Sequence, residues 1–165
     1  MVMLCGALLA GCMVNARFNG LKPVTPEYKE SFSFVGRYDE SATLSVEVDS
    51  LQPLLRWEAF PRPEYLPGDP GKLIATISDV TYELKIMNLA GGLLYERKGL
   101  TDPYHKVEAN LRTGTIYTWS VRAQFDLDGH PKVTRWSSMT VQVFGDKAAY
   151  SLPRDVPLMF KTPGI

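Results

Sequence analysis

The side chains best suited to nucleophilic, acid–base or metal chemistry are few in this sequence, which holds only two cysteines and two histidines among its 165 residues. His130 stands between Gly129 and Pro131, a setting typical of a solvated turn, and His105 follows Pro103-Tyr104 in an expected loop or strand edge. An imidazole acting as a general base needs a partner within hydrogen-bond reach, and the sequence places none beside either histidine. We therefore expect two exposed histidines, no catalytic residues and no enzymatic activity.

Motifs that bind cofactors or metals are also missing from the sequence. It has no GxSxG elbow and no HExxH helix, and Gly91-Gly92 is not followed by the Lys-Ser/Thr of a phosphate-binding loop. Asp126-Leu127-Asp128-Gly129 has the opening of a calcium loop, but Ser137 stands where the bidentate Glu would be needed. We expect no cofactor and no metal, and a plain hairpin turn at Asp128-Gly129.

Both cysteines lie in an uncharged N-terminal segment, MVMLCGALLAGCMV. This segment is shorter than the roughly 20 apolar residues that span a bilayer, and its length and small residues are typical of a secretory signal. Leu9-Ala10-Gly11-Cys12 resembles the lipobox of bacterial lipoproteins. The resemblance implies that residues 1–11 are removed as a signal peptide and that the Cys12 thiol carries the lipid. The alternative is a buried N-terminal strand or helix with incidental cysteines.

The same resemblance implies a location in the bacterial cell envelope. An Asp after the lipidated cysteine is the usual inner-membrane retention signal of lipoproteins, and here Met13 follows Cys12. The expected location is therefore the outer membrane, with the lipid as the membrane anchor. Residues 12–42 are mixed and polar, and we interpret them as the lipidated cysteine and a tether, with one short strand near Phe32.

Composition limits the remaining function classes. Eighteen Lys and Arg balance eighteen Asp and Glu, giving a formal net charge of +0, whereas a nucleic-acid-binding domain is typically basic. With 45% hydrophobic residues the chain can form a real core. The length suits a single domain with tails.

Most of the chain alternates apolar and polar residues with period two, which predicts half-buried strands. The apolar positions of these runs are Leu44, Val46 and Val48; Leu55 and Trp57; Tyr82, Leu84 and Ile86; Tyr117, Trp119, Val121, Ala123 and Phe125; and Met139, Val141 and Val143. With two shorter runs, near Leu93 and Val107, they make about seven strands, which is typical of a β-sandwich.

Residues Leu111 to Ala123 resemble the fibronectin type III signature, a Leu followed by Pro-Gly-Thr-x-Tyr and alternating apolar residues, with Thr113 in place of the usual Pro. Leu55-x-Trp57 is similar to that family's second strand and Tyr82-x-Leu84-x-Ile86 to its third. The resemblance covers residues 43–145 and implies an all-β, fibronectin type III/immunoglobulin-like β-sandwich. It also implies a core Trp57, and a buried Tyr117 whose hydroxyl bonds to upstream backbone.

A candidate interaction surface remains outside this core. Arg135-Trp136-Ser137 is similar to half of the Trp-Ser motif of cytokine-receptor fibronectin domains, which implies a stack of Arg122 on Trp136. Simple packing at the rim and a sugar-binding platform on Trp136 are the alternatives. The long connection 61–78 adds Tyr65 and Leu66 to this surface, since long irregular loops are often functional.

The C-terminal tail, residues 146–165, carries an apolar segment, Leu158-Met159-Phe160. We expect it to fold back on the sandwich, and the alternative is a partner-binding segment. Taken together, the sequence predicts a lipid-anchored envelope module that binds an unidentified envelope protein. The alternative function is a carbohydrate-binding surface lipoprotein that uses Trp136 and the 61–78 loop to hold a polysaccharide.

Overall fold

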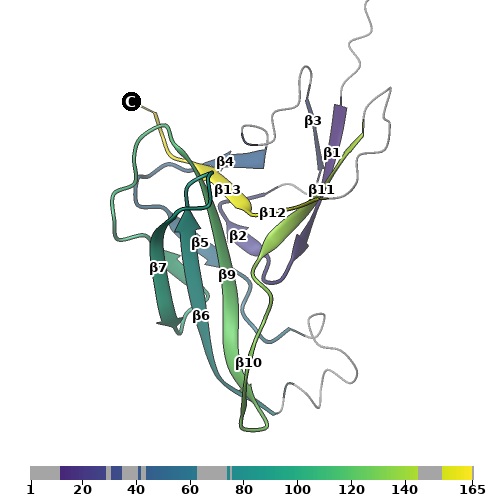
Figure 1. The fold of residues 1–165 in the computed structure, drawn as a ribbon, viewed down its shortest axis with the longest axis vertical. Coiled ribbons are helices and arrows are strands. Elements are labelled where there is room, and N and C mark those ends of the chain that lie inside the picture. The colour runs from purple at the N-terminus through teal and green to yellow at the C-terminus, as the bar shows by residue number, and fades with distance from the viewer. Residues whose placement is uncertain are drawn as a thin grey trace, which may run out of the picture.

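The structure is a computed structural model that describes residues 12–28, 31–34, 41, 44–62, 74, 76–144 and 154–164. It is an all-β protein, as the period-two pattern predicted, and its strands fall into three sheets (Figure 1). The strands are β1 (Cys12–Asn19), β2 (Pro23–Thr25), β3 (Ser31–Phe34), β4 (Ser45–Glu47), β5 (Leu54–Trp57), β6 (Ile77–Met87), β7 (Leu93–Leu100), β8 (Tyr104–Lys106), β9 (Ile116–Leu127), β10 (His130–Val133), β11 (Ser138–Phe144), β12 (Arg154–Val156) and β13 (Leu158–Lys161).

The six-stranded sheet has the order β4-β13-β9-β6-β7, with β10 paired to β9. The three-stranded sheet has the order β2-β5-β8, and the four-stranded sheet has the order β12-β11-β1-β3. All strand pairs are antiparallel except β13 with β4, which is parallel. Long β9 and β6 form the centre of the molecule in Figure 1, and β1, β3 and β11 gather to one side of them.

The core forms where the alternating apolar faces of these sheets meet. Trp57 of β5 is 2% exposed and packs edge-on against Tyr82 of β6, with ring centroids 5.5 Å apart. Tyr117 is also buried, and its hydroxyl accepts a hydrogen bond from the Arg112 backbone N–H, 2.9 Å away and upstream in the chain. Both predictions for these aromatic residues are confirmed.

Strand β9 has one edge that three separate segments cover in turn. β10 pairs with its C-terminal part through the two-residue turn Asp128-Gly129, where both residues have positive φ, as the sequence predicted for this hairpin. β13 pairs with its N-terminal part, so the apolar tail folds back as expected. Between the two, Ser137 N–H donates to the Val121 carbonyl at 2.8 Å and Thr134 N–H to the Ala123 carbonyl at 2.9 Å.

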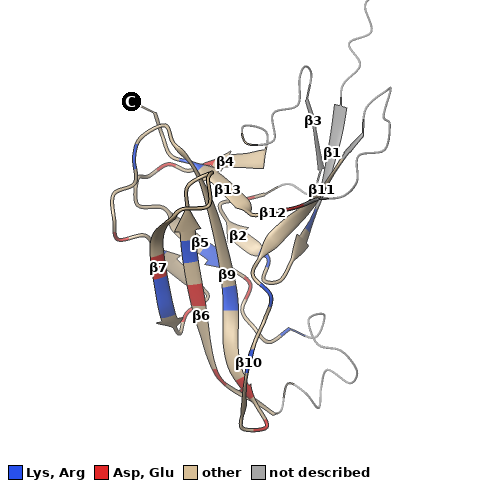
Figure 2. Cartoon of the chain, in the orientation of Figure 1, with Lys and Arg blue, Asp and Glu red and all other residues tan. Residues whose placement is uncertain are grey.

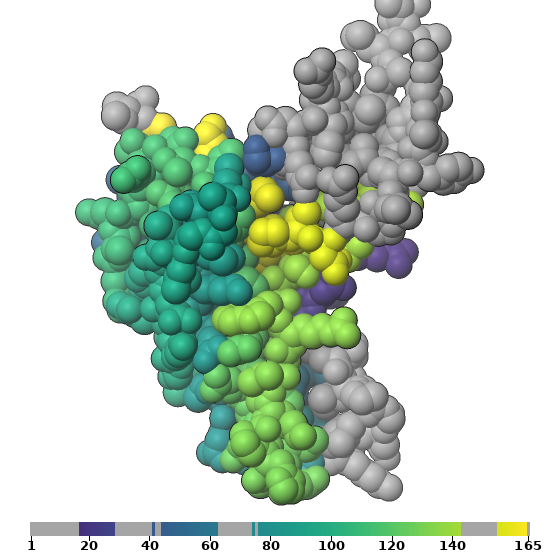
Figure 3. Space-filling view, viewed as in Figure 1, coloured from purple at the N-terminus to yellow at the C-terminus, as the bar shows by residue number. Residues whose placement is uncertain are grey.

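The chain leaves this edge of β9 after Ser137 and later returns to it as β13. After Ser137 it enters β11, which pairs with β1 instead of β9. It returns through β12 and crosses between sheets at Pro157, a residue that cannot donate to a backbone ladder. In Figure 3 the returning C-terminal segment (yellow) lies packed against the green and teal strands.

The expectation of a tether over residues 12–42 is wrong for the described part of that range. β1 pairs along its length with β11, and Leu21 is 1% exposed in the core. Gly20, which follows β1, adopts φ 68° where a Cβ would lie 3.0 Å from the Arg135 carbonyl oxygen, so only glycine fits this close approach.

The boundaries 43–145 are also too narrow for the folded unit. Leu158 and Phe160 from the tail have no exposed surface, and β13 lies between β4 and β9. The connection expected over 61–78 spans residues 58–76 in the structure, because β5 ends at Trp57 and β6 begins at Ile77. Residues 63–73 of that connection lie outside the described part of the chain.

Candidate functional site

The structure brings together only part of the surface that the sequence predicted. Cys12 is the first residue of β1, where its backbone pairs with Phe34, and its side chain is not among those described. Tyr65 and Leu66 lie outside the described residues. Arg135 is exposed, while Arg122 and Trp136 meet on the outer face of β6 and β9.

The predicted stack of Arg122 on Trp136 is present, and it includes a second cation. Arg122 Cζ lies 4.5 Å and Lys85 Nζ 4.0 Å from the centroid of the Trp136 ring. The sequence did not predict a role for Lys85. Lys85 lies on β6, and the register in which β6 pairs with β9 cannot be predicted from the sequence alone. A sugar stacking on a face of this half-buried ring that a cation covers would have to displace that cation.

A buried carboxylate anchors this cluster. Glu83 is 5% exposed and forms an ion pair with Arg122 Nε at 2.6 Å, and it also accepts a hydrogen bond from the Gln124 side-chain amide. Cross-strand pairing of Glu83 with Arg122 sets this contact. Figure 2 shows the resulting neighbouring bands of opposite charge on β6 and β9. Because Glu83 is paired with Arg122, and both Arg122 and Lys85 lie over the Trp136 ring, this cluster is better suited to holding the face rigid than to binding a ligand.

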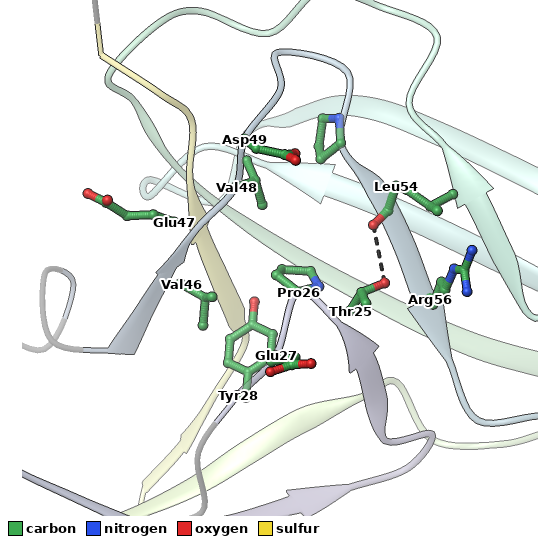
Figure 4. Close-up of a pocket in the computed structure, with 11 residues that line it drawn as sticks. Thr25, Pro26, Glu27, Tyr28, Val46, Glu47, Val48, Asp49, Leu54 and Arg56 are labelled. Atoms are coloured by element: carbon green, nitrogen blue, oxygen red, sulfur yellow. Dashed lines mark hydrogen bonds between the residues drawn. The ribbon is translucent and has the colours of Figure 1, made fainter.

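A groove of about 770 Å³ lies elsewhere, where the edges of two sheets approach each other (Figure 4). Residues 46–49 form one wall, beginning in edge strand β4 of the six-stranded sheet. The other side is formed by Pro53, by Leu54 and Arg56 of β5, and by residues 25–28, which continue from edge strand β2. This volume is in the range of ordinary ligand pockets.

The floor of the groove is apolar and firmly supported. Figure 4 shows Tyr28, Pro26 and Val46 beside one another. The Tyr28 hydroxyl donates to the Met159 carbonyl at 2.5 Å and accepts from Trp119 Nε1 at 2.9 Å, so it is held by β13 and β9. Burial raises the pKa of Tyr28 far above its ordinary value, so this hydroxyl stays protonated and serves as a structural donor.

The rim of the groove carries an excess of negative charge. Three carboxylates, Glu27, Glu47 and Asp49, line it together with one guanidinium, Arg56. Glu47 forms an exposed ion pair with Lys161 at 3.1 Å, and Arg56 lies over the Tyr104 ring at 5.8 Å. The sequence could not reveal this groove, since its walls come from three segments that are separated along the chain.

His105 does not sit in the exposed setting that the sequence predicted. Its Nε2 lies 2.7 Å from the Tyr95 hydroxyl, and this contact joins β8 to β7. The same hydroxyl accepts a long hydrogen bond of 3.4 Å from the Glu108 N–H. Arg97 completes the cluster by pairing with Glu108 and lying 4.8 Å from the Tyr95 ring centroid. His130, in contrast, is exposed in β10 as expected.

The surroundings of His105 favour its neutral form. Partial burial lowers the pKa of His105 below its ordinary value, the nearby Glu108 carboxylate acts against this, and the Arg97 charge adds to the lowering. The hydrogen bond from Arg97 also lowers the pKa of Glu108. Partly buried His105 therefore acts as a link between two strands rather than as a free acid or base.

Among the described residues, no helix is long and apolar enough to cross a membrane. The same part of the chain has no group of three His, Cys, Asp or Glu side chains arranged to hold a metal ion. Comparison with protein-family models, with curated proteins and with solved structures gives no match to this chain.

Proposed function

We propose that this protein is a lipid-anchored binding module of the bacterial cell envelope that holds another protein in the groove between β2, β4 and β5. The observation that carries the binding role is the groove itself. Its apolar floor is fixed to the core through Tyr28. Edge strands β4 and β2 border it, and central strand β5 contributes the exposed side chain of Leu54, 38% exposed. Preformed clefts of this kind are the usual sites of specific binding.

The proposed architecture is a fibronectin type III/immunoglobulin-like sandwich extended at both ends. Trp57 in the three-stranded sheet and Tyr117 in the six-stranded sheet support it, because each is buried where that family's signature implies. β1 and β13 are additions to this frame. Such folds commonly serve as scaffolds for binding sites, although a fold alone does not assign a function.

The proposed anchor is a lipid on Cys12, supported by the Leu9-Ala10-Gly11-Cys12 sequence. A single acyl chain holds a protein only weakly, so stable outer-membrane attachment requires more than one. β1 begins at Cys12, so the lipid would be attached directly at the end of a strand. The proposed module would then stand close to the membrane surface.

The anchor is tested by metabolic labelling with a fatty-acid probe in a bacterial host. We expect the wild type and Cys5→Ser to be labelled and to sediment with membranes, because Cys5 lies upstream of the predicted cleavage site. Cys12→Ser should be unlabelled and released. Equal labelling of Cys12→Ser and Cys5→Ser would contradict the lipoprotein proposal.

The binding role is tested by photocrosslinking in envelope preparations from the same host. A photoreactive amino acid at Leu54, in the groove, should give discrete protein adducts. The same substitution at Leu94, a leucine 53% exposed on β7, should not. Equal patterns from the two positions would contradict a role for the groove.

A further inference from the structure

We propose that the groove takes its partner as an added β-strand, an extended segment of another protein in which apolar residues alternate with Lys or Arg and which lies along the open edge of β4. This inference rests on the proposed binding function and specifies the chemistry of the partner. The edge, floor and rim of the groove each support a different part of it.

The backbone edge of β4 supplies the first argument. β13 pairs with β4 on one side only, and Val48 N–H donates to the Lys161 carbonyl at 2.9 Å. Successive residues of a strand direct their N–H and C=O groups to opposite edges, so those of Glu47 point away from β13. β4 is the terminal strand of its sheet in the described part of the chain. A terminal strand is a template for a further strand where its outer backbone groups are unpaired.

The floor of the groove supplies the second argument, because it selects side chains with period two. Val46 and Val48 line the groove on the same side of β4, together with Pro26, Tyr28 and Leu54. In an added strand, every second side chain would face this apolar floor and the others would face the rim and solvent. The expected partner therefore has alternating apolar residues.

The charge on the rim supplies the third argument and decides the sign of the partner. Glu27, Glu47 and Asp49 outnumber Arg56 and Lys161, the ion-pair partner of Glu47, although the whole chain has a formal net charge of +0. Natural edge strands often carry Lys to repel other strands, whereas this edge carries carboxylates that would attract cationic side chains. An acidic segment would meet repulsion at the same rim.

The test uses the full chain in detergent and three fluorescent nine-residue peptides. The first alternates Lys and Val, the second alternates Glu and Val, and the third is the Lys-Val peptide with alternate amides N-methylated along one edge. Fluorescence anisotropy at low ionic strength should give at least tenfold tighter binding of the Lys-Val peptide than of the other two. In NMR spectra, the Glu47 amide should shift on addition of the Lys-Val peptide only.

Charge-reversal variants locate the binding site. Asp49→Lys and Glu27→Lys should each weaken Lys-Val binding by about tenfold at low salt. Glu96→Lys, which makes the same charge change on the exposed edge strand β7, should leave it unchanged. Circular dichroism would confirm that each variant keeps its strand signal.

Two outcomes would overturn the inference. Equal binding of the Lys-Val and Glu-Val peptides would refute the cationic partner, and full binding by the N-methylated peptide would refute the added strand. If Leu54 gives specific crosslinks while the Lys-Val peptide does not bind, this inference fails and the proposed function stands. If Leu54 gives no crosslinks and the peptide does not bind, both fail.

Discussion

At the scale of single residues, two buried tryptophans differ in the environment of one nitrogen atom. Trp119 Nε1 donates to the Tyr28 hydroxyl at 2.9 Å, whereas Trp57 Nε1 is buried without a hydrogen-bond partner among the described residues. An unsatisfied buried donor costs about 1–3 kcal/mol of folding free energy. Trp57 therefore stabilises the core through its ring alone, and Trp119 through its ring and its N–H.

This difference predicts unequal effects of the same substitution. Trp57→Phe removes an unsatisfied donor, whereas Trp119→Phe removes the N–H that donates to the Tyr28 hydroxyl. The loss in the free energy of unfolding should therefore be about 1–2 kcal/mol smaller for Trp57→Phe than for Trp119→Phe. Trp57→Ala should cost about 3–5 kcal/mol because it opens a cavity. Urea denaturation followed by circular dichroism measures all three. A larger loss for Trp57→Phe than for Trp119→Phe would contradict the assignment of the unpaired nitrogen.

The environment of His105 predicts a pH dependence with a definite sign. Its pKa is lowered in the folded state, so the His105 side chain binds more protons in the unfolded chain as the pH falls below about 6.5. The contribution of His105 to stability therefore decreases in that direction. Thermal melting from pH 7.5 to pH 5 should show a larger fall in Tm for the wild type than for His105→Gln.

His130→Gln is the matched control, because His130 is an exposed histidine of β10. Its Tm should follow the wild type across the same range. A wild-type Tm that rises on acidification relative to His105→Gln would refute the burial of a neutral imidazole between β7 and β8.

At the scale of elements, β13 shows how a short strand can hold a sheet together. It contributes only four residues, yet it pairs with β9 on one side and β4 on the other. Phe160 has no exposed surface and packs against Tyr117, with ring centroids 5.6 Å apart. The Met159 carbonyl accepts the hydrogen bond of Tyr28, so β13 also positions the floor of the groove.

Phe160→Ala should therefore lower the free energy of unfolding by about 3–5 kcal/mol, as other buried aromatic truncations do. Its neighbour Lys161 forms an exposed ion pair with Glu47, and such pairs contribute about 0–1 kcal/mol. Lys161→Ala should accordingly have little effect in the same urea titration. Similar losses for the two variants would mean that β13 does not form part of the core.

At the scale of the whole molecule, the fold depends on both ends of the described chain. β1 pairs with β11 in the middle of the four-stranded sheet, and Leu21 packs into the common core. β11 pairs with β1 and not with β9, and β13 pairs with the edge of β9 that remains. The N-terminal and C-terminal segments are thus structural parts of one unit, not flexible appendages.

A chain cut to residues 43–145 should therefore fail to fold cooperatively, although it contains the whole fibronectin-like pattern. Removing β1 and β13 leaves edges of β11 and β9 unpaired and exposes the apolar surface that Leu21, Leu158 and Phe160 cover. Thermal melting and the dispersion of amide NMR signals should distinguish it from a chain of residues 12–165, which should melt in one transition. Cooperative melting of the shorter chain would restore the narrower boundaries.

Local sequence was enough to predict the β class, most strands, and several individual positions. Period-two alternation located β5, β6, β9 and β11, and the Asp128-Gly129 turn followed from the need for positive φ. The buried Trp57 and the stack of Arg122 on Trp136 followed from the family resemblance. The alternating strands could be predicted locally because side-chain direction in a strand depends only on residue parity.

Only the tertiary structure decided which segments meet. Pairing of β1 with β11 joins distant parts of the chain, and the mixed, polar composition of residues 12–42 predicted a tether instead of these strands. The partner of His105 became visible only when β7 and β8 came together. The groove exists only where segments 25–28, 46–49 and 53–56 converge. Backbone pairing carries no side-chain signature, so the period of a strand predicts which face is buried but not which strand lies beside it.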